Sequence, residues 1–185
     1  MEEGEELSNA EGTDYRGLAA RANYLAADRA DIQYAVKEIC RDMSKPPLAG
    51  KRKIKRLARY LKGAPRVVLR YRYQKREEEA WGYSDSDWAG CKKTAKSTSG
   101  GAIVMGSHTL KTWSSTQKNI TLSSGEAELV AAVKTCTETI GVTQMAKDWG
   151  GVDLEILILV DSNAATGIAN IRGNGRMRHV KVGDL

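Results

Sequence analysis

The chain has no phenylalanine, only three prolines and only two histidines in 185 residues. Without phenylalanine, a hydrophobic core has to be filled by Leu, Ile, Val, Trp and Tyr. No run of about 18 apolar residues is present, and the first fifteen residues are acidic instead of basic and then apolar. The sequence therefore predicts neither a membrane span nor a signal peptide, and we expect an intracellular protein with no membrane partner.

Cysteine is also scarce, and its positions are informative. Cys40, Cys91 and Cys136 are odd in number and far apart in the sequence, and no pair has the spacing of zinc ligands. This pattern is typical of reduced thiols in a reducing compartment.

Charge is unevenly distributed along the chain. Twelve Lys or Arg residues and no acid lie between Lys51 and Arg76, whereas six acids and no base lie between Met1 and Tyr15. Apolar residues recur at helical spacing in the first half of the basic stretch, which predicts a helix that ends near Gly63. Its outer face would carry Lys51, Lys53, Lys55, Arg56, Arg59 and Lys62. So much positive charge without a compensating acid favours contact with nucleic-acid phosphates, although an ordinary solvated helix face is the alternative.

Three carboxylates stand at places where secondary-structure elements should begin or end. Asp161 ends the apolar run 156–160, which is typical of a fully buried strand. Glu128 follows the N-cap residues Ser123 and Ser124 and should lie in the first two turns of a helix. Asp85 comes at or near the end of an alternating strand. These acids are therefore expected to converge.

Converging carboxylates repel one another unless a cation neutralises them. Hard oxygen ligands suit Mg²⁺ or Mn²⁺ better than zinc. A pair of such ions can catalyse phosphodiester hydrolysis, so this is the reaction that the acids indicate. The alternative is that each acid is a helix cap or turn residue with no catalytic role.

Five ordered blocks of sequence resemble the ribonuclease H domain of Ty1/copia-type retrotransposon Pol polyproteins. The segment upstream of them is similar to the part of these polyproteins that joins the polymerase to the nuclease. The blocks are Tyr83-Ser84-Asp85-Ser86-Asp87-Trp88-Ala89-Gly90, Lys96-Ser97-Thr98-Ser99-Gly100-Gly101, Trp113-Ser114-Ser115-Thr116-Gln117, Leu122-Ser123-Ser124-Gly125-Glu126-Ala127-Glu128-Leu129 and Val160-Asp161-Ser162-Asn163-Ala164-Ala165.

The resemblance implies a metal-dependent endonuclease that hydrolyses the RNA strand of an RNA–DNA hybrid during reverse transcription. Asp85, Glu128 and Asp161 match metal-binding and catalytic acids of the family, which uses two Mg²⁺ ions that Mn²⁺ can replace. Asp87 and Glu126 match neighbouring positions that are usually not ligands. The implied partners are the hybrid and the upstream polymerase domain, inside a cytoplasmic retrotransposon particle.

A basic stretch near the end of the chain would add nucleic-acid contacts through Arg176, Arg178 and His179. In the family a fourth acid follows a final strand beyond this stretch, and the chain reaches Leu185 before such a strand. At the position where the family commonly has an acid, two residues after His179, this chain has Lys181.

The expected fold is α/β, with a ribonuclease H-like mixed sheet flanked by helices and preceded by a small helical connector. Residues 1–65 would form an acidic N-terminal tail and the thumb-like connector, and residues 66–185 a nuclease domain that lacks its final strand. The expected helices are 31–43, the basic helix to residue 63, 124–147 and 162–170. The expected strands are 67–73, 81–85, 101–105, 109–113 and 155–160.

Two other interpretations of the sequence remain open. The chain could be a truncated, catalytically inactive remnant that still binds nucleic acid. It could also be an unrelated α/β domain whose acids are caps. Dependence on a divalent metal distinguishes both from the nuclease.

Overall fold

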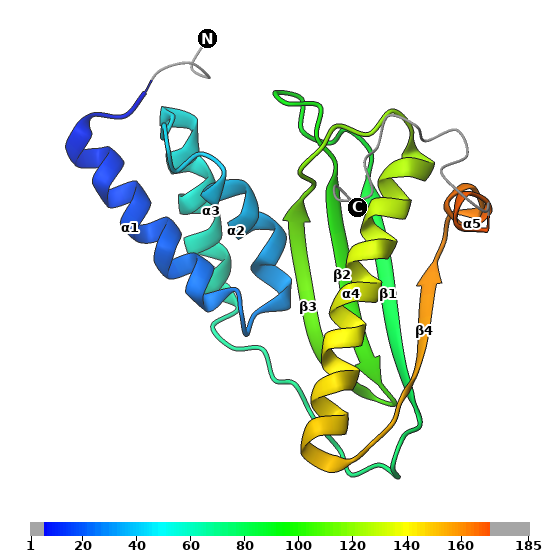
Figure 1. Cartoon of the computed structure of the whole chain (residues 1–185). Helices are drawn as coiled ribbons and strands as arrows, with labels where there is room; N and C mark the ends of the chain where they lie inside the picture. The colour runs from blue at the N-terminus through cyan, green and yellow to red at the C-terminus, as the bar shows by residue number, and fades with distance from the viewer. Residues whose placement is uncertain (1–5, 171–185) are drawn as a thin grey trace. The chain divides into compact units, whose positions relative to one another are not determined.

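The computed structural model describes residues 6–170 of the chain. The chain divides into two compact units, Met1–Leu69 and Arg70–Leu185 (Figure 1). The helices of the first unit are α1 Asn9–Leu25, the 3₁₀ helix η1 Ala30–Ile32, α2 Gln33–Cys40 and α3 Leu48–Gly63. The second unit contains the strands and helices β1 Glu79–Asp87, β2 Thr98–Met105, β3 His108–Thr116, α4 Ser124–Gly150, β4 Glu155–Val160 and α5 Asn163–Ala169.

Part of the acidic start of the chain is helical, because α1 begins at Asn9, whereas the sequence predicted no helix before residue 31. Ser8 and Glu11 make a reciprocal capping box: the Ser8 side chain accepts from the Glu11 amide, and the Glu11 carboxylate accepts from the Ser8 amide at 3.2 Å. These bonds satisfy amide groups that the first helical turn leaves free. Tyr15 and Ala19 of α1 are then buried in the core of unit 1.

The core of unit 1 is one hydrophobic cluster formed by side chains on or next to α1, η1, α2 and α3. Its buried members are Tyr15, Ala19, Ala26, Ile32, Val36, Ile39 and Leu57. The Tyr15 hydroxyl donates to the carbonyl oxygen of Ile39 at 2.8 Å, so the ring fills space while its polar end is satisfied. Burial raises the pKa of Tyr15 to about 12. The helix expected over 31–43 is divided between η1 and α2 and ends at Cys40 instead of residue 43.

Unit 2 is a four-stranded mixed sheet in the order β3-β2-β1-β4, which confirms the predicted α/β class. β1 pairs antiparallel with β2 and parallel with β4, and β2 pairs antiparallel with β3. Figure 1 shows α4 crossing one face of this sheet and α5 following β4. This arrangement is compatible with a ribonuclease H-like fold.

Helix α4 approaches β1 closely because β1 has a glycine at the contact. A methyl group at Gly82 would lie 2.7 Å from a side-chain carbon of Ile158 and 2.8 Å from side-chain atoms of Thr135 and Thr139. Only hydrogen fits in that space. At its far end α4 stops at Gly151, which adopts the left-handed conformation with φ 60°.

The strand predictions differ from the structure in three ways. β1, β2 and β3 are longer than the predicted strands 81–85, 101–105 and 109–113. β4 has the predicted bounds, but it is one of the two edge strands of the described sheet and is only partly buried. The segment 67–73 is extended without being a strand, and its apolar side chains are exposed, so neither face of its alternating pattern is buried. Between residues 6 and 170, no helix is both long enough and apolar enough to cross a membrane.

Candidate metal centre

Asp85, Glu128 and Asp161 converge at one end of the sheet of unit 2. One carboxylate oxygen from each lies within 4.8 Å of the others. Two of the acids meet because β1 and β4 are parallel: Ser84 is paired with Val160, so the next residues along the two strands are Asp85 and Asp161. Glu128 lies in the second turn of α4, the helix that packs on β1. The convergence expected from the sequence is therefore present, and binding of metal by these acids stays a prediction.

Glu128 is the buried member of the cluster, with 8% of its surface exposed. Its Oε1 atom accepts two hydrogen bonds of 3.1 Å from Ser86, one from the amide and one from the hydroxyl. Its Oε2 atom is buried and has no hydrogen-bond partner among the described residues. Burial raises the pKa of Glu128, and the charges of Asp161 and Asp85 raise it further, while the bonds from Ser86 act in the opposite direction.

An unpartnered buried carboxylate oxygen beside two more carboxylates is costly unless a proton or a cation satisfies it. Asp85 and Asp161 are exposed, and their carboxylates make no hydrogen bond within the described part of the chain, so the carboxylate oxygens are available to a ligand. The donor set is oxygen only. It fits Mg²⁺ or Mn²⁺, which prefer such ligands, and contains no soft ligand for zinc.

Two neighbouring acids have structural roles instead. The Asp87 carboxylate accepts from the amide of Thr98 on the adjacent strand. Glu126 is 2% exposed and accepts from the amide of Leu122 at 2.5 Å, just before α4 begins. Backbone groups therefore engage both carboxylates, and the expectation that these two positions are not ligands stays a prediction.

Sequence reasoning missed Ser86, which holds Glu128 in place. The available signal was strand alternation, because Ser86 follows Gly82 and Ser84 at a spacing of two residues and so faces the same helix. Gln117 was missed as a support as well. Its amide donates to the Ser99 hydroxyl at 3.0 Å and to the Ala127 carbonyl at 2.8 Å, which ties β3 to β2 and to the first turn of α4.

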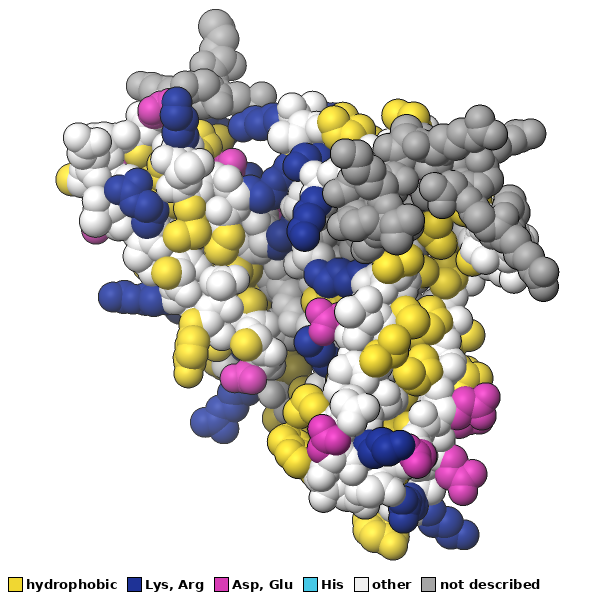
Figure 2. Space-filling view, viewed as in Figure 1, with side chains coloured by type: hydrophobic (Ala, Val, Ile, Leu, Met, Phe, Trp, Pro, Cys, Tyr) yellow, Lys and Arg dark blue, Asp and Glu magenta, His cyan; other side chains and the backbone are white. Residues whose placement is uncertain are grey.

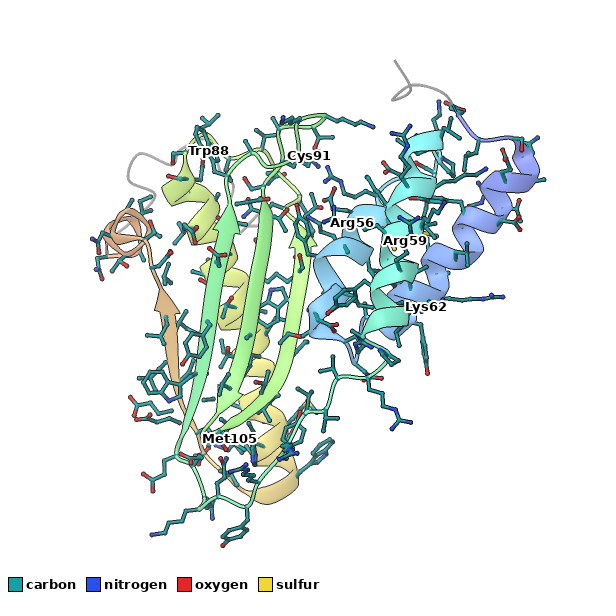
Figure 3. All side chains as sticks on the ribbon, turned by 180° about the vertical axis from the view of Figure 1, so that it is seen from behind. Arg56, Arg59, Lys62, Trp88, Cys91 and Met105 are labelled. Carbon is teal, nitrogen blue, oxygen red and sulfur yellow. The ribbon has the colours of Figure 1, made fainter. Side chains whose placement is uncertain are left out.

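The basic face of α3 in unit 1 is exposed as predicted, but it is partly neutralised. Lys51 pairs with Glu11 at 2.5 Å, and Lys53 pairs with Asp42 at 2.7 Å. The inference that this helix lacks compensating acids was therefore wrong for two of its six cations, because the acids come from other segments. The cations that make no ion pair within residues 6–170 are Lys55, Arg56, Arg59 and Lys62, and Figure 3 labels the last three along α3.

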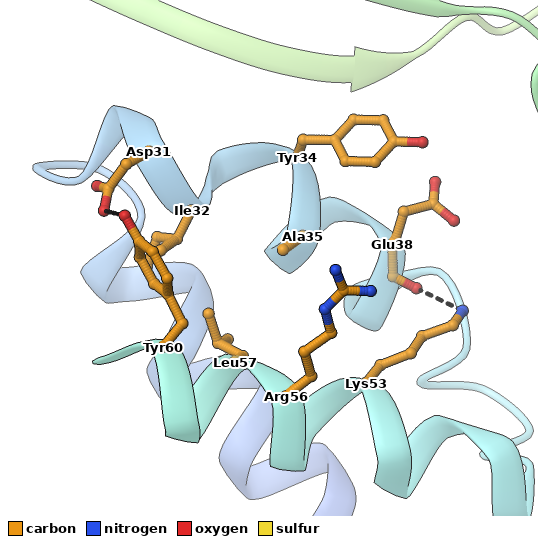
Figure 4. A pocket seen from close by; sticks show the side chains of 9 residues that line it. All are labelled: Asp31, Ile32, Tyr34, Ala35, Glu38, Lys53, Arg56, Leu57 and Tyr60. Atoms are coloured by element: carbon orange, nitrogen blue, oxygen red, sulfur yellow. Dashed lines mark hydrogen bonds between the residues drawn. The ribbon is translucent and has the colours of Figure 1, made fainter. Parts of the chain in front are cut away.

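A pocket of about 420 Å³ lies between α2 and α3. Figure 4 shows Arg56 extending toward α2 in this pocket, while Lys53 is tied to the carbonyl of Glu38 and Tyr60 to Asp31. Arg56 is thus the cation of the pocket that stays available to a ligand. The other predicted contacts, Arg176, Arg178 and His179, lie outside the described residues.

Sequence comparison relates the chain to transposon Pol polyproteins. It is 32% identical over 172 residues to the retrovirus-related Pol polyprotein from transposon RE1 of Arabidopsis thaliana, which covers 92% of this chain and 12% of that protein. The polyprotein from transposon RE2 of the same plant is 31% identical over 170 residues, 91% of this chain and 12% of that protein. The chain therefore spans about one eighth of the length of these relatives.

A shorter relative is the uncharacterized mitochondrial protein AtMg00810 of Arabidopsis thaliana, 34% identical over 126 residues, or 68% of this chain and 52% of that protein. No family model and no solved structure matches the chain. The homologues thus include Ty1/copia-type retrotransposon Pol polyproteins at about 30% identity over most of the chain, as the sequence blocks predicted. The ribonuclease H assignment itself stays a prediction.

Proposed function

We propose that unit 2 is a ribonuclease H module of a copia-type Pol polyprotein, which hydrolyses the RNA strand of an RNA–DNA hybrid during reverse transcription. The observation that carries the proposal is the convergence of Asp85, Glu128 and Asp161, with a buried and unpartnered oxygen on Glu128. Similarity to transposon Pol polyproteins over most of the chain supports it independently.

The three carboxylates would contribute differently to the binding of divalent metal. Glu128 is the fixed ligand, because Ser86 immobilises one oxygen and leaves the other free. Asp85 and Asp161 are exposed and would supply the ligand oxygens that face solvent. Two Mg²⁺ ions bound here would supply an activated water and stabilisation of the leaving oxygen, the usual chemistry of phosphodiester hydrolysis. Mn²⁺, which prefers the same oxygen ligands, is the expected substitute.

The second part of the proposal concerns the hybrid. Lys55, Arg56, Arg59 and Lys62 form an exposed row without ion pairs among the described residues, and such cations bind phosphates regardless of base sequence. We assign this row to backbone contacts with the hybrid. The upstream polymerase domain and the cytoplasmic retrotransposon particle belong to the same proposal.

The test is cleavage of a hybrid whose RNA strand is end-labelled, with matched RNA and DNA duplexes beside it, in Mg²⁺, Mn²⁺ or chelator. We expect metal-dependent loss of the RNA strand of the hybrid alone. Asp161→Asn, which keeps the shape and removes the charge, should abolish it. Asp14→Asn is the matched control, since Asp14 is an exposed acid on α1.

The rival function is binding of the hybrid without cleavage. The row of four cations on α3 supports binding with cleavage and binding without cleavage equally well. Filter binding at several salt concentrations separates the two functions. Binding that weakens with salt, with no RNA loss in either metal, would identify a nucleic-acid-binding protein and reject the nuclease. Cleavage that persists in Asp161→Asn would show that the carboxylate cluster is not its active site.

A further inference from the structure

Unit 2 has a concave site, here called the distal site, at the opposite end of its sheet from the carboxylate cluster. Its volume is about 620 Å³, and its walls are the segment 71–77, the turn between β2 and β3, and the end of α4. In Figure 3, Met105 of this site and Trp88, which follows β1, mark the two ends of the sheet. Because α4 rises about 1.5 Å per residue, Trp149 near its end lies about 30 Å from Glu128. The two sites are therefore separate.

One wall of this distal site is held in place by Gln74, although its segment forms no strand. The Gln74 side-chain amide donates to the Met105 carbonyl at 3.0 Å. Its carbonyl oxygen accepts from the Ser107 amide at 2.9 Å and from the Ser107 hydroxyl at 2.8 Å. A single side chain thus binds the extended segment to the β2–β3 turn, and it uses both of its polar atoms to do so.

A second set of bonds fixes the start of the same wall. The Tyr71 hydroxyl donates to the Thr109 carbonyl at 2.9 Å, and His108 Nε2 donates to the Arg72 carbonyl at 2.7 Å. The Tyr71 and His108 rings meet edge to face, with their centroids 5.1 Å apart. The wall is therefore formed before any ligand arrives.

Two large aromatic side chains of the distal site are left open to solvent. Tyr73 is 98% exposed and Trp149 is 83% exposed, although both line the pocket. Neither contributes to the core of unit 2. Figure 2 shows further hydrophobic side chains along the outward face of α4, the helix that carries Trp149. Aromatic faces that are exposed beside a concavity are suited to stacking on a planar ligand.

Positive charge accompanies these rings. Arg72, Lys75 and Arg76 line the pocket, are exposed, and make no ion pair in the part of the chain that the structure describes. Glu77 is the acid that lines the same pocket. Three cations against one carboxylate favour an anionic ligand.

We infer that the distal site binds single-stranded polynucleotide, with bases stacked on Trp149 and Tyr73 and phosphates held by Arg72, Lys75 and Arg76. Stacking rings interleaved with unpaired cations are the recurring arrangement of proteins that bind single strands without sequence preference. A duplex fits less well, because its bases are already stacked on one another and are not free to enter a pocket. An acidic protein surface would use the cations and leave the rings unused.

The experiment is fluorescence anisotropy of a fluorescein-labelled ten-nucleotide oligo(dT) with the full chain, in chelator so that no metal-dependent reaction contributes. Trp149→Ala should weaken binding by about 5- to 100-fold, the usual loss for one stacked base. The double variant Arg72→Ala/Arg76→Ala should reduce the salt slope by about 1.4, since each phosphate contact on a single strand contributes about 0.7. Iodouracil in place of thymine should cross-link to Trp149 or Tyr73.

Two control variants and one competitor accompany the binding experiment. Tyr24→Ala and Arg21→Ala replace an exposed ring and an exposed cation on α1 and should leave the affinity unchanged. Unchanged affinity in both Trp149→Ala and Tyr73→Ala would overturn the inference. So would equal competition by poly-glutamate with no effect of either ring variant, which would mark an acidic protein as the ligand. Because no metal is present, these outcomes are independent of whether unit 2 is a nuclease.

Discussion

Replacing the buried acid of the metal centre by its amide should stabilise unit 2 when no metal is present. Glu128→Gln keeps the oxygen that accepts from Ser86 and removes a charge that faces Asp85 and Asp161. At the 4.8 Å limit of the cluster, each like-charge pair costs about 1 kcal/mol in water and about 3.5 kcal/mol at an effective dielectric constant of about 20. Both aspartates are exposed, so the lower value applies, and removing two pairs should gain about 2 kcal/mol.

The assay is urea unfolding at pH 8 in chelator, followed by tryptophan fluorescence. All four tryptophans, at positions 81, 88, 113 and 149, belong to unit 2, so the signal reports this unit alone. Adding Mg²⁺ should reverse the order. The wild type gains about 2.7 kcal/mol at a concentration one hundred times its Kd, while the variant loses a ligand and gains less.

Glu155→Gln is the matched control, because Glu155 is an exposed acid at the start of β4. It should change neither the stability in chelator nor the gain with Mg²⁺. The reasoning is refuted if Glu128→Gln is less stable than the wild type in chelator, or if Mg²⁺ stabilises both proteins equally. The first result would show that the charge of Glu128 is not under repulsion, and the second that it is not a metal ligand.

Two further predictions concern packing and acid stability. Gly82→Ala would set a methyl group 2.7 Å from Ile158, so we expect unit 2 to lose about 1–3 kcal/mol in the same urea assay. Gly141→Ala is its control, because it meets no atom within 4 Å and should be neutral or slightly stabilising. The hydrogen bonds from Arg29 lower the pKa of Asp31 to about 2, so their contribution to unit 1 is complete above the ordinary pKa of an aspartate and is lost as pH falls toward 2. The protection of unit 1 amides against hydrogen exchange, relative to free amides at the same pH, should fall over that range in the wild type and change less in Asp31→Asn. An identical pH profile in the two proteins would contradict the assignment.

Predictions that depend on local sequence signals were the successful ones. β4 has the expected bounds because an apolar run between glycines and a helix cap determines both of its ends. Helix α4 begins at Ser124 as expected and stops at a glycine pair, although it ends at Gly150 and not at residue 147. The convergence of Asp85, Glu128 and Asp161 followed from element ends alone, since strand ends and helix starts meet at the same edge of an α/β sheet.

The errors arose where distant residues decide the outcome. Lys51 and Lys53 are neutralised by Glu11 and Asp42, which belong to other segments and could not be assigned as partners from spacing. The alternation in 67–73 resembled a strand, yet a strand needs a hydrogen-bonded neighbouring strand. This segment instead bonds to β3 through the Tyr71 hydroxyl, which donates to Thr109, and through the Arg72 carbonyl, which accepts from His108. The partial burial of β4 likewise depends on its place in the sheet order, which a single run of residues does not specify.

Helix α4 also sets the distance between the carboxylate cluster and the distal site. It is one continuous helix of 27 residues with Glu128 near its beginning and Trp149 near its end, and it contains no proline at which it could kink. The separation of the two sites is therefore determined by the number of residues between them and does not adjust to what is bound. At the rise of about 3.4 Å per nucleotide that each strand has in a B-form duplex, about nine steps would cover those 30 Å. A polynucleotide bound at both sites would have to span this distance. The length of α4 would therefore set how many nucleotides separate the distal site from any bond broken at the carboxylates.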